Sequence, residues 1–217
     1  YERSRGKAIR AHGGTGNDSF YIGQGVDAVL DLDGGAGQDS FLIQGGLSQG
    51  WVDGQFKYSI VSGGAGDDEF FSGAAQSARF FGDDRPLAGA LTWAVPYTGS
   101  RGNDRFNGGA GPVVVDMGLG NDKVATGPNA DTVIIRAGTS RVDTGEGGDT
   151  LLLDPNYGLT TLTVTGGTGN DVLRIAAFDS TADITLGAMS LEHAAPTGYL
   201  TVNFNDKLDR IELNDTA

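Results

Sequence analysis

The sequence predicts an all-β fold, a right-handed parallel β-roll or β-helix solenoid with two irregular insertions. Three observations predict it: a glycine-rich motif that returns along the chain, a nine-residue spacing between many of its copies, and short apolar clusters in place of helical patterns. Glycine contributes 37 of the 217 residues, and Asp outnumbers Glu by 23 to 5. Asp and Gly favour turns whereas Glu favours helices, so this composition argues against a helical protein.

Charge and residue usage exclude several classes of protein. The formal net charge is −13, which would repel the phosphates of a nucleic acid. The chain has no Cys, which excludes disulfide frameworks and thiolate metal sites. No apolar stretch approaches the roughly 18 residues of a membrane span. Because the chain begins with Tyr1 rather than Met, we expect it to be a piece of a larger protein.

The motif has seven copies, and each copy ends in Asp. The string GGTGND occurs at 13–18 and again at 166–171, and variants of it lie at 34–39, 63–68, 99–104, 117–122 and 144–149. An apolar residue stands two positions after each terminal Asp, and these residues are Phe20, Phe41, Phe70, Phe106, Val124, Leu151 and Leu173. We therefore expect each glycine-rich turn to lead into a short strand that points one side chain inward.

The spacing of the copies follows a period of nine with slips and insertions. The register is unbroken along Asp104, Val113, Asp122, Asp131, Ser140 and Asp149. Asp27 and Val29 fit the same spacing near the start, and Thr160 and Leu162 occupy a comparable slot near the end. Two units make one flattened coil, and a single coil cannot bury its apolar side chains, so the fold exists only as a stack.

The pattern divides the chain into three parts. Residues 1–12 are predicted to be an N-terminal flank, 13–175 the repeat solenoid, and 176–217 C-terminal strands or a cap of the same solenoid. Two stretches near 47–62 and 72–98 interrupt the repeats and are richer in aromatic residues and Pro. We interpret them as loops or extra short strands that project from the rod.

The repeat resembles the RTX, or haemolysin-type, calcium-binding repeat G-G-x-G-x-D-x-U-x, over about Gly13 to Ile175. The resemblance implies a parallel β-roll with several Ca²⁺ ions held in the turns between coils. The carboxylate ligands would be Asp18, Asp39, Asp68, Asp104, Asp122, Asp149 and Asp171, with Asp27 and Asp131 as weaker candidates. The glycines that supply carbonyls or permit the turns would be Gly14, Gly16, Gly35, Gly37, Gly64, Gly66, Gly102, Gly120, Gly147, Gly167 and Gly169.

The donor chemistry supports calcium independently of the resemblance. Ca²⁺ takes six to eight oxygen ligands from carboxylates and carbonyls, and stacked Asp side chains would repel one another without a cation. Val113 and Ser140 stand where Asp is expected, so sites that need them should be absent or depleted. We expect about three to six ions. In the alternative interpretation, Gly, Asn and Asp only form turns and bind nothing.

We expect no enzyme here. The pentapeptide 46–50 (GLSQG) matches the G-x-S-x-G pattern of a nucleophile elbow, but no helix is predicted after it, and only His12 and His193 could serve as an imidazole base. A second class remains open, in which the aromatic insertions around Trp51 and Trp93 bind or modify a polysaccharide. Self-association through the solenoid ends is also open.

The leading hypothesis is a structural calcium-binding module of a large secreted bacterial protein, such as an adhesin, a surface-layer protein or a matrix rod. The resemblance implies an extracellular or cell-surface location, reached by type I secretion of the parent protein. Extracellular calcium sites are often weak, with Kd of about 10⁻⁴–10⁻³ M. The chain would therefore stay unfolded inside the cell and fold on calcium outside it.

Overall fold

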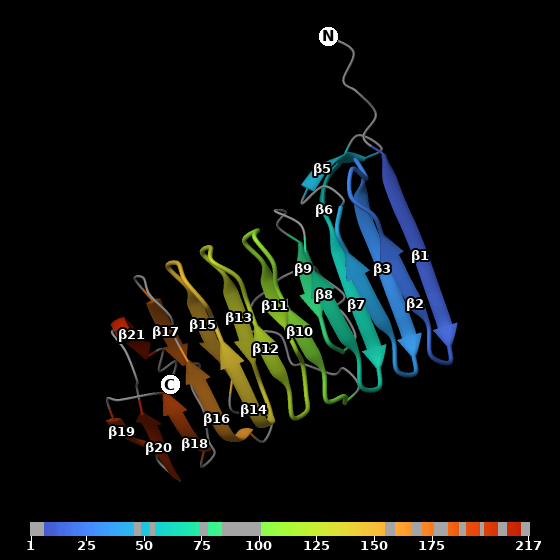
Figure 1. The fold of residues 1–217 in the computed structure, drawn as a ribbon. Helices are drawn as coiled ribbons and strands as arrows, with labels where there is room; N and C mark the ends of the chain where they lie inside the picture. Colours follow the sequence, from blue (N-terminus) through green and yellow to red (C-terminus); the bar gives the residue numbers. More distant parts are fainter. Residues whose placement is uncertain are drawn as a thin grey trace.

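Short strands alternate between two long sheets along the chain (Figure 1). The structure is a computed structural model that describes residues 7–45, 49–52, 55–73, 78–83, 101–154, 159–165, 171–175, 182–186, 190–195, 198–203 and 208–213. All regular structure in these residues is β-structure, and the strands within each long sheet pair in parallel up to the C-terminal end. The predicted all-β parallel β-roll is confirmed.

The first sheet has nine strands, all parallel to their neighbours. In spatial order they are β1 (Ala8–Thr15), β3 (Val29–Ala36), β7 (Ile60–Ala65), β9 (Arg79–Phe81), β11 (Val114–Asp116), β13 (Thr132–Ile135), β15 (Thr150–Leu153), β17 (Asp171–Ile175) and β21 (Leu208–Leu213). Spatial order follows chain order, so each coil lies on the previous one, as expected for a repeat array.

The second sheet has ten strands and faces the first. In order they are β2 (Ser19–Ile22), β4 (Ser40–Ile43), β8 (Glu69–Ser72), β10 (Arg105–Asn107), β12 (Lys123–Ala125), β14 (Gly138–Asp143), β16 (Leu159–Thr165), β18 (Ala182–Leu186), β20 (Gly198–Asn203) and β19 (Ser190–Ala195). The terminal pair β19–β20 is antiparallel. A separate antiparallel hairpin, β5 (Gln49–Val52) and β6 (Gln55–Tyr58), occupies the first insertion.

The core is a single layer of side chains between the two sheets. Each sheet contributes one or more inward residues per coil, and the fully buried ones include Leu32, Val61, Phe80, Val115 and Val133 from the first sheet and Phe41, Phe70, Phe106 and Val142 from the second. The rings of Phe20 and Phe41 stack with centroids 4.7 Å apart, and those of Phe41 and Phe70 follow at 4.9 Å. This spacing matches the separation of hydrogen-bonded strands, so the rings repeat with the coils.

The coil boundaries differ from the predicted ones at the start of the chain. β1 begins at Ala8 and pairs with β3, so the first coil starts within the stretch predicted to be a flank. Leu32, not Val29, aligns with the inward Val61 of the next coil. Leu30 lies two residues before Leu32 and therefore holds the position of the motif Asp. Asp27 lies three residues before that position.

Two further differences lie in the insertion near 72–98 and after Asp149. β9 lies inside that insertion and completes a coil of the first sheet. In β16, Val164 aligns with the inward Val142, and Leu162 aligns with Ser140. The inward position that was predicted at Leu162 is therefore held by Val164, two residues later. The register between β14 and β16 shifts between Gly138 and Thr139.

Candidate metal centre

The turns of the roll gather along two edges. Turns that leave the nine-stranded sheet form the first edge, at 13–18, 34–39, 63–68, 101–104, 117–122 and 136–140. Turns that leave the ten-stranded sheet form the second edge, and 23–28, 108–113, 126–131 and 144–149 are described there. Because nine residues are half a coil, consecutive repeats alternate between the two edges, and their Asp residues form two separate columns.

The first edge carries a ladder in which every rung joins neighbouring coils. The backbone N–H of each motif Asp donates to Oδ1 of the Asp one coil further on, over 2.7 Å (Asp18 to Asp39), 2.8 Å (Asp39 to Asp68), 2.8 Å (Asp68 to Asp104) and 3.1 Å (Asp104 to Asp122). The last rung runs from Asp122 N–H to Oγ of Ser140 at 3.1 Å. The carboxylates thus stack in register despite the unequal lengths of the coils.

A second, shorter ladder runs along the opposite edge toward the C-terminal end. Val113 N–H donates to Asp131 Oδ1 (2.8 Å), Asp131 N–H to Asp149 (2.9 Å) and Asp149 N–H to Asp171 (3.0 Å). Near the N-terminal end the equivalent rung is formed by Leu30 N–H and Ser59 Oγ at 2.9 Å. The two columns of Asp therefore occupy different halves of the roll.

The second oxygen of most ladder carboxylates has no hydrogen-bond partner. Among the described residues this holds for the buried Oδ2 atoms of Asp18, Asp39, Asp68, Asp104, Asp122 and Asp149. A buried polar atom without a partner costs about 1–3 kcal/mol, and more when it is charged. An unpartnered oxygen at six repeated positions is a regular feature of this fold and not an isolated packing defect.

Backbone carbonyl oxygens face the same place as the orphaned carboxylate oxygens. At Gly34, an added Cβ would overlap both Asp39 Oδ2 and the carbonyl oxygen of Gly63 in the next coil. Gly63 repeats the arrangement with Asp68 Oδ2 and the carbonyl oxygen of Gly82. Each turn therefore brings a carboxylate oxygen and a carbonyl oxygen of the next coil together, and only glycine leaves the space between them open.

The electrostatics of the columns favour a bound cation. Burial raises the pKa of Asp104 to about 9, of Asp122 to about 8, of Asp68 to about 7 and of Asp149 to about 6, and it raises the pKa of Asp39 as well. The backbone N–H of the preceding rung lowers each pKa, but less than burial raises it, and neighbouring Asp charges raise it further. A cation beside these oxygens would remove the penalty for the charged form.

The donor set fits calcium better than a softer metal. No three His, Cys, Asp or Glu side chains converge on one point within the part of the chain that the structure describes. An ion in a turn would therefore take one carboxylate and several backbone carbonyls from two adjacent coils. Such all-oxygen, mostly carbonyl coordination suits a hard ion that accepts many ligands, which is Ca²⁺.

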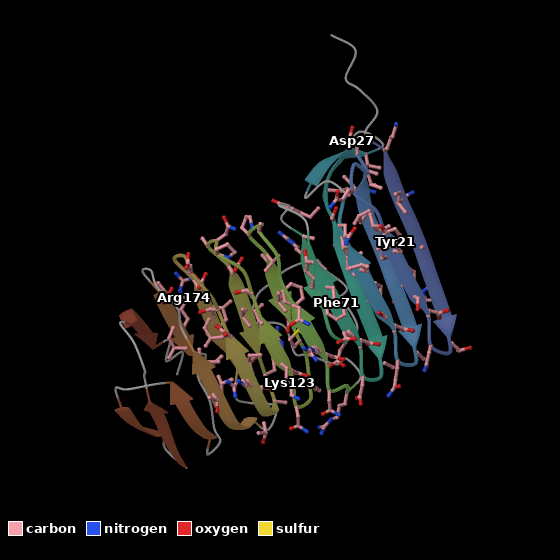
Figure 2. All side chains as sticks on the ribbon, in the orientation of Figure 1. Tyr21, Asp27, Phe71, Lys123 and Arg174 are labelled. Atoms are coloured by element: carbon pink, nitrogen blue, oxygen red, sulfur yellow. The ribbon has the colours of Figure 1, made fainter. Side chains whose placement is uncertain are left out.

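Not every predicted ligand joins a column of orphaned oxygens. Asp27 is exposed at the edge opposite the first ladder (Figure 2). Asp131 lies in the second ladder, but its Oδ2 accepts the Gly127 N–H at 3.2 Å and so has a protein partner. Asp171 accepts the last rung of the second ladder, and Gly167 and Gly169 lie outside the described residues.

The predicted glycines occupy the turns as expected in the first coils. Gly35 has φ of 101° and Gly37 of 148°, conformations that side chains other than glycine rarely adopt. Positive φ recurs at Gly14, Gly16, Gly64, Gly66 and Gly147. Gly102 and Gly120 are needed because neighbouring coils approach closely. A Cβ at Gly102 would overlap the carbonyl oxygen of Gly66, and one at Gly120 would overlap that of Gly102.

The nine-residue spacing located Ser140 in the place of an Asp, but Ser59 and Gly82 could not be found from the motif. Ser59 and Ser140 take the place of Asp in the ladders, and Gly82 rather than Gly99 supplies the first glycine of the turn that ends at Asp104. The insertion starts after Asp83 and splits that turn, so a search for contiguous repeats assigns the wrong glycine. Ser59 has no sequence signal except its position two residues before Val61.

The family comparison agrees with this geometry. The model of the RTX calcium-binding nonapeptide repeat matches four segments, at residues 10–29, 51–75, 98–133 and 163–174. The chain contains RTX calcium-binding repeats. Searches of curated proteins and of solved structures gave no significant match.

The RTX repeats make this chain a calcium-binding repeat module, and RTX repeats as a family are structural and generally not catalytic. In the part of the chain that the structure describes, no helix is long and apolar enough to cross a membrane. The matched segments include turns on both edges, whereas Asp39 and Asp149 lie outside them.

Proposed function

We propose that this RTX module is a calcium-responsive structural rod of a larger secreted protein, which folds when calcium binds in the turns. The observation that carries the proposal is the set of six buried Oδ2 atoms without a hydrogen-bond partner, each in a ladder carboxylate. The ligands would be the carboxylates of Asp18, Asp39, Asp68, Asp104, Asp122 and Asp149, with carbonyls from the adjacent glycine turns. Asp171 ends the second column and is a further candidate.

The columns explain why calcium would control folding. At neutral pH the charged forms of these carboxylates oppose burial, and their mutual repulsion adds to that cost. A site needs two neighbouring coils, so it does not exist in the unfolded chain, and the free energy of binding contributes directly to folding. Weak sites with Kd of about 10⁻⁴–10⁻³ M would stay empty in a cell and fill outside it.

The secreted location and a role as an adhesin, a surface-layer protein or a matrix rod belong to this proposal. They are supported by the family, by the net charge of −13 and by the dependence of folding on calcium that the columns imply. The polysaccharide alternative rested on Trp51 and Trp93. The side chain of Trp51 and the whole of Trp93 lie outside what the structure describes, and no observation favours that alternative.

The test is a calcium titration of the chain after exhaustive removal of metal, followed by far-UV circular dichroism and isothermal titration calorimetry. We expect a transition from coil to β-structure, reversal by a chelator, up to six ions per chain, and no effect of magnesium at equal concentration. A metal-free chain whose β-signal does not change with calcium would overturn the proposal, and its glycine turns would then be purely structural.

A further inference from the structure

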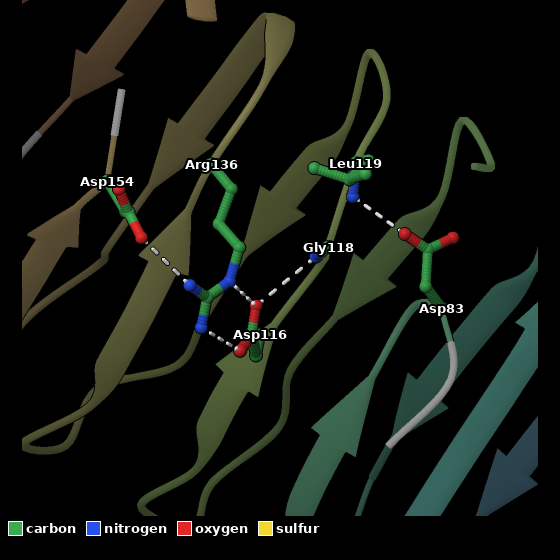
Figure 3. A network of polar contacts seen from close by, with 6 residues as sticks. All are labelled: Asp83, Asp116, Gly118, Leu119, Arg136 and Asp154. Atoms are coloured by element: carbon green, nitrogen blue, oxygen red, sulfur yellow. Dashed lines mark hydrogen bonds and ion pairs between the residues drawn. The ribbon is translucent and has the colours of Figure 1, made fainter. Parts of the chain in front are cut away.

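A buried ion-pair network links neighbouring coils partway along the length of the roll, and its side chains take no part in either ladder (Figure 3). Arg136 follows β13 at the first edge, in the place where the preceding coils have Gly14, Gly35, Gly64, Asp83 and Gly118. Its side chain is only 3% exposed. A buried guanidinium in a glycine position is a departure from the repeat that the calcium columns do not explain.

Arg136 connects three successive coils. Its Nε and Nη2 donate to the two carboxylate oxygens of Asp116, at the end of β11, over 3.1 Å and 2.8 Å. Its Nη1 donates to Oδ2 of Asp154, just after β15, at 3.1 Å. Both carboxylates are buried, at 1% and 4% exposure of the side chain. The paired geometry toward Asp116 is the strong, two-pronged form of the arginine–carboxylate interaction.

The same coils carry fewer of the orphaned carboxylate oxygens than the coils before them. The coil of Arg136 ends in Ser140, which completes the ladder with a neutral hydroxyl and brings no second carboxylate oxygen. On the opposite edge, both oxygens of Asp131 accept backbone N–H groups. Between β11 and β15 the orphaned Oδ2 atoms are those of Asp122 and Asp149, whereas four, in Asp18, Asp39, Asp68 and Asp104, lie before β11.

Apolar side chains replace glycine in this segment. In the earlier coils the first residue of the turn is glycine, as at Gly34, Gly63 and Gly82. The corresponding residues are Met117, just after β11, and Ile135 and Leu153, the last residues of β13 and β15, and all three are fully buried in the core cluster. Burial of side chains of this size stabilises these coils through the hydrophobic effect, a contribution that the glycine coils do not gain.

We propose that Arg136 is a protein-supplied clamp that joins β11, β13 and β15 without calcium and makes this segment the nucleus from which the rest of the roll folds. The guanidinium neutralises carboxylates from different coils and holds them together, as a bound ion would in the columns. The N-terminal coils have the longest run of orphaned oxygens and would add to the nucleus when calcium arrives. This order of folding rests on the proposed function.

The test is hydrogen–deuterium exchange with mass spectrometry on the whole chain, with and without calcium. In metal-free buffer we expect protected amides within 114–153 and unprotected amides within 8–72. Arg136→Met should reduce the protection of 114–153 about a hundredfold or more, because it removes the positive charge that neutralises two buried carboxylates. Arg141→Met is the matched control, since Arg141 is an exposed residue of β14 in the same segment, and it should keep the protection.

A second variant keeps the test decisive if Arg136→Met does not fold. Asp154→Ala removes the acceptor that links Arg136 to β15 and leaves the pair of Arg136 and Asp116 in place. We expect it to reduce protection at 150–153 while β11 and β13 keep theirs. Equal protection in wild type and both variants without calcium would overturn the clamp.

The outcomes also separate the clamp from the proposed function. If the wild-type chain is fully exposed without calcium and folds with it, the calcium proposal stands and the nucleus is excluded. If the whole chain is protected without calcium, folding on calcium is excluded, whereas a loss of protection in Arg136→Met would still support the clamp.

Discussion

The backbone N–H of Asp68 donates to Oδ1 of Asp104, 36 residues further along the chain, at 2.8 Å. An insertion separates the two residues in sequence, yet the rung has the same length as the one between Asp39 and Asp68. The ladder therefore tolerates large loops between coils, provided that each coil returns its Asp to the column. The free oxygen of each carboxylate is then available for a ligand.

Asp104→Asn should have opposite effects with and without calcium. The amide keeps an acceptor for Asp68 N–H and can donate to the nearby carbonyl oxygen of Met117, while the buried charge disappears. We expect the metal-free chain to become more stable by about 1–3 kcal/mol and the calcium-loaded chain to bind one ion fewer. Urea denaturation and calorimetry measure both quantities. Asp143→Asn, at an exposed position of β14, is the control.

Protonation of the buried Asp side chains should stabilise the metal-free fold and so substitute in part for calcium. The carboxylates of Asp68, Asp104 and Asp122 have pKa values of about 7, 9 and 8 in the fold, raised by burial above the ordinary value of 3.8. The metal-free fold therefore binds more protons than the unfolded chain, and its stability falls as pH rises from about 4 to about 9.

Circular dichroism of the metal-free chain across this pH range provides the measurement for the acid effect. We expect β-structure near pH 5 and its loss near pH 9, whereas the affinity for calcium should increase with pH because the ligands must lose their protons. A metal-free chain that is equally stable at both ends of the range would contradict the assignment of the buried carboxylates.

Gly34→Ala should remove one calcium site by sterics alone. The new Cβ would overlap Asp39 Oδ2 and the Gly63 carbonyl oxygen, so the two oxygens would have to move apart. We expect a loss of about 1–3 kcal/mol in stability with calcium present and a loss of one bound ion. Gly23→Ala is the matched control, because its Cβ would meet only the ring of Tyr21 at 3.5 Å or more. A similar effect of both variants would speak against the steric argument.

Ser140→Ala tests the end of the first ladder. Removal of the hydroxyl leaves the buried N–H of Asp122 without its acceptor, which should cost about 1–3 kcal/mol in thermal or urea denaturation. Ser19→Ala, at an exposed position of β2, should change stability by no more than about 0.5 kcal/mol. If Ser140→Ala lowers the stability no more than Ser19→Ala does, the hydrogen bond between Asp122 and Ser140 does not contribute to stability.

The repeat predicted most of the fold because it combines two local signals. Glycine-rich turns and a single inward residue, such as Phe41 or Phe70, recur at a fixed spacing, and stacking is the only way to bury those side chains. The motif Asp residues follow from the same spacing. Asp27 shows where spacing alone misleads, because its turn has a different length and Leu30 takes the ladder position.

The features that sequence reasoning missed depend on contacts between coils. Arg136 is 20 residues from Asp116 and 18 from Asp154, and no local pattern marks these three as partners. The turn that ends at Asp104 begins at Gly82 and is interrupted by an insertion, so its first half is not adjacent to its second half in sequence. Such relationships appear only when the coils are stacked.

The parallel stacking of coils also fixes how the rod would respond to a pulling force. Adjacent coils are hydrogen-bonded along the rod, so tension applied to the two ends loads one interface at a time instead of shearing many strands together. Neighbouring rungs are as few as 18 residues apart, and a coil of that length occupies about 4.8 Å of the rod. Once detached it would release about 60 Å of extended chain. A module built in this way would act as a tether that lengthens stepwise under load.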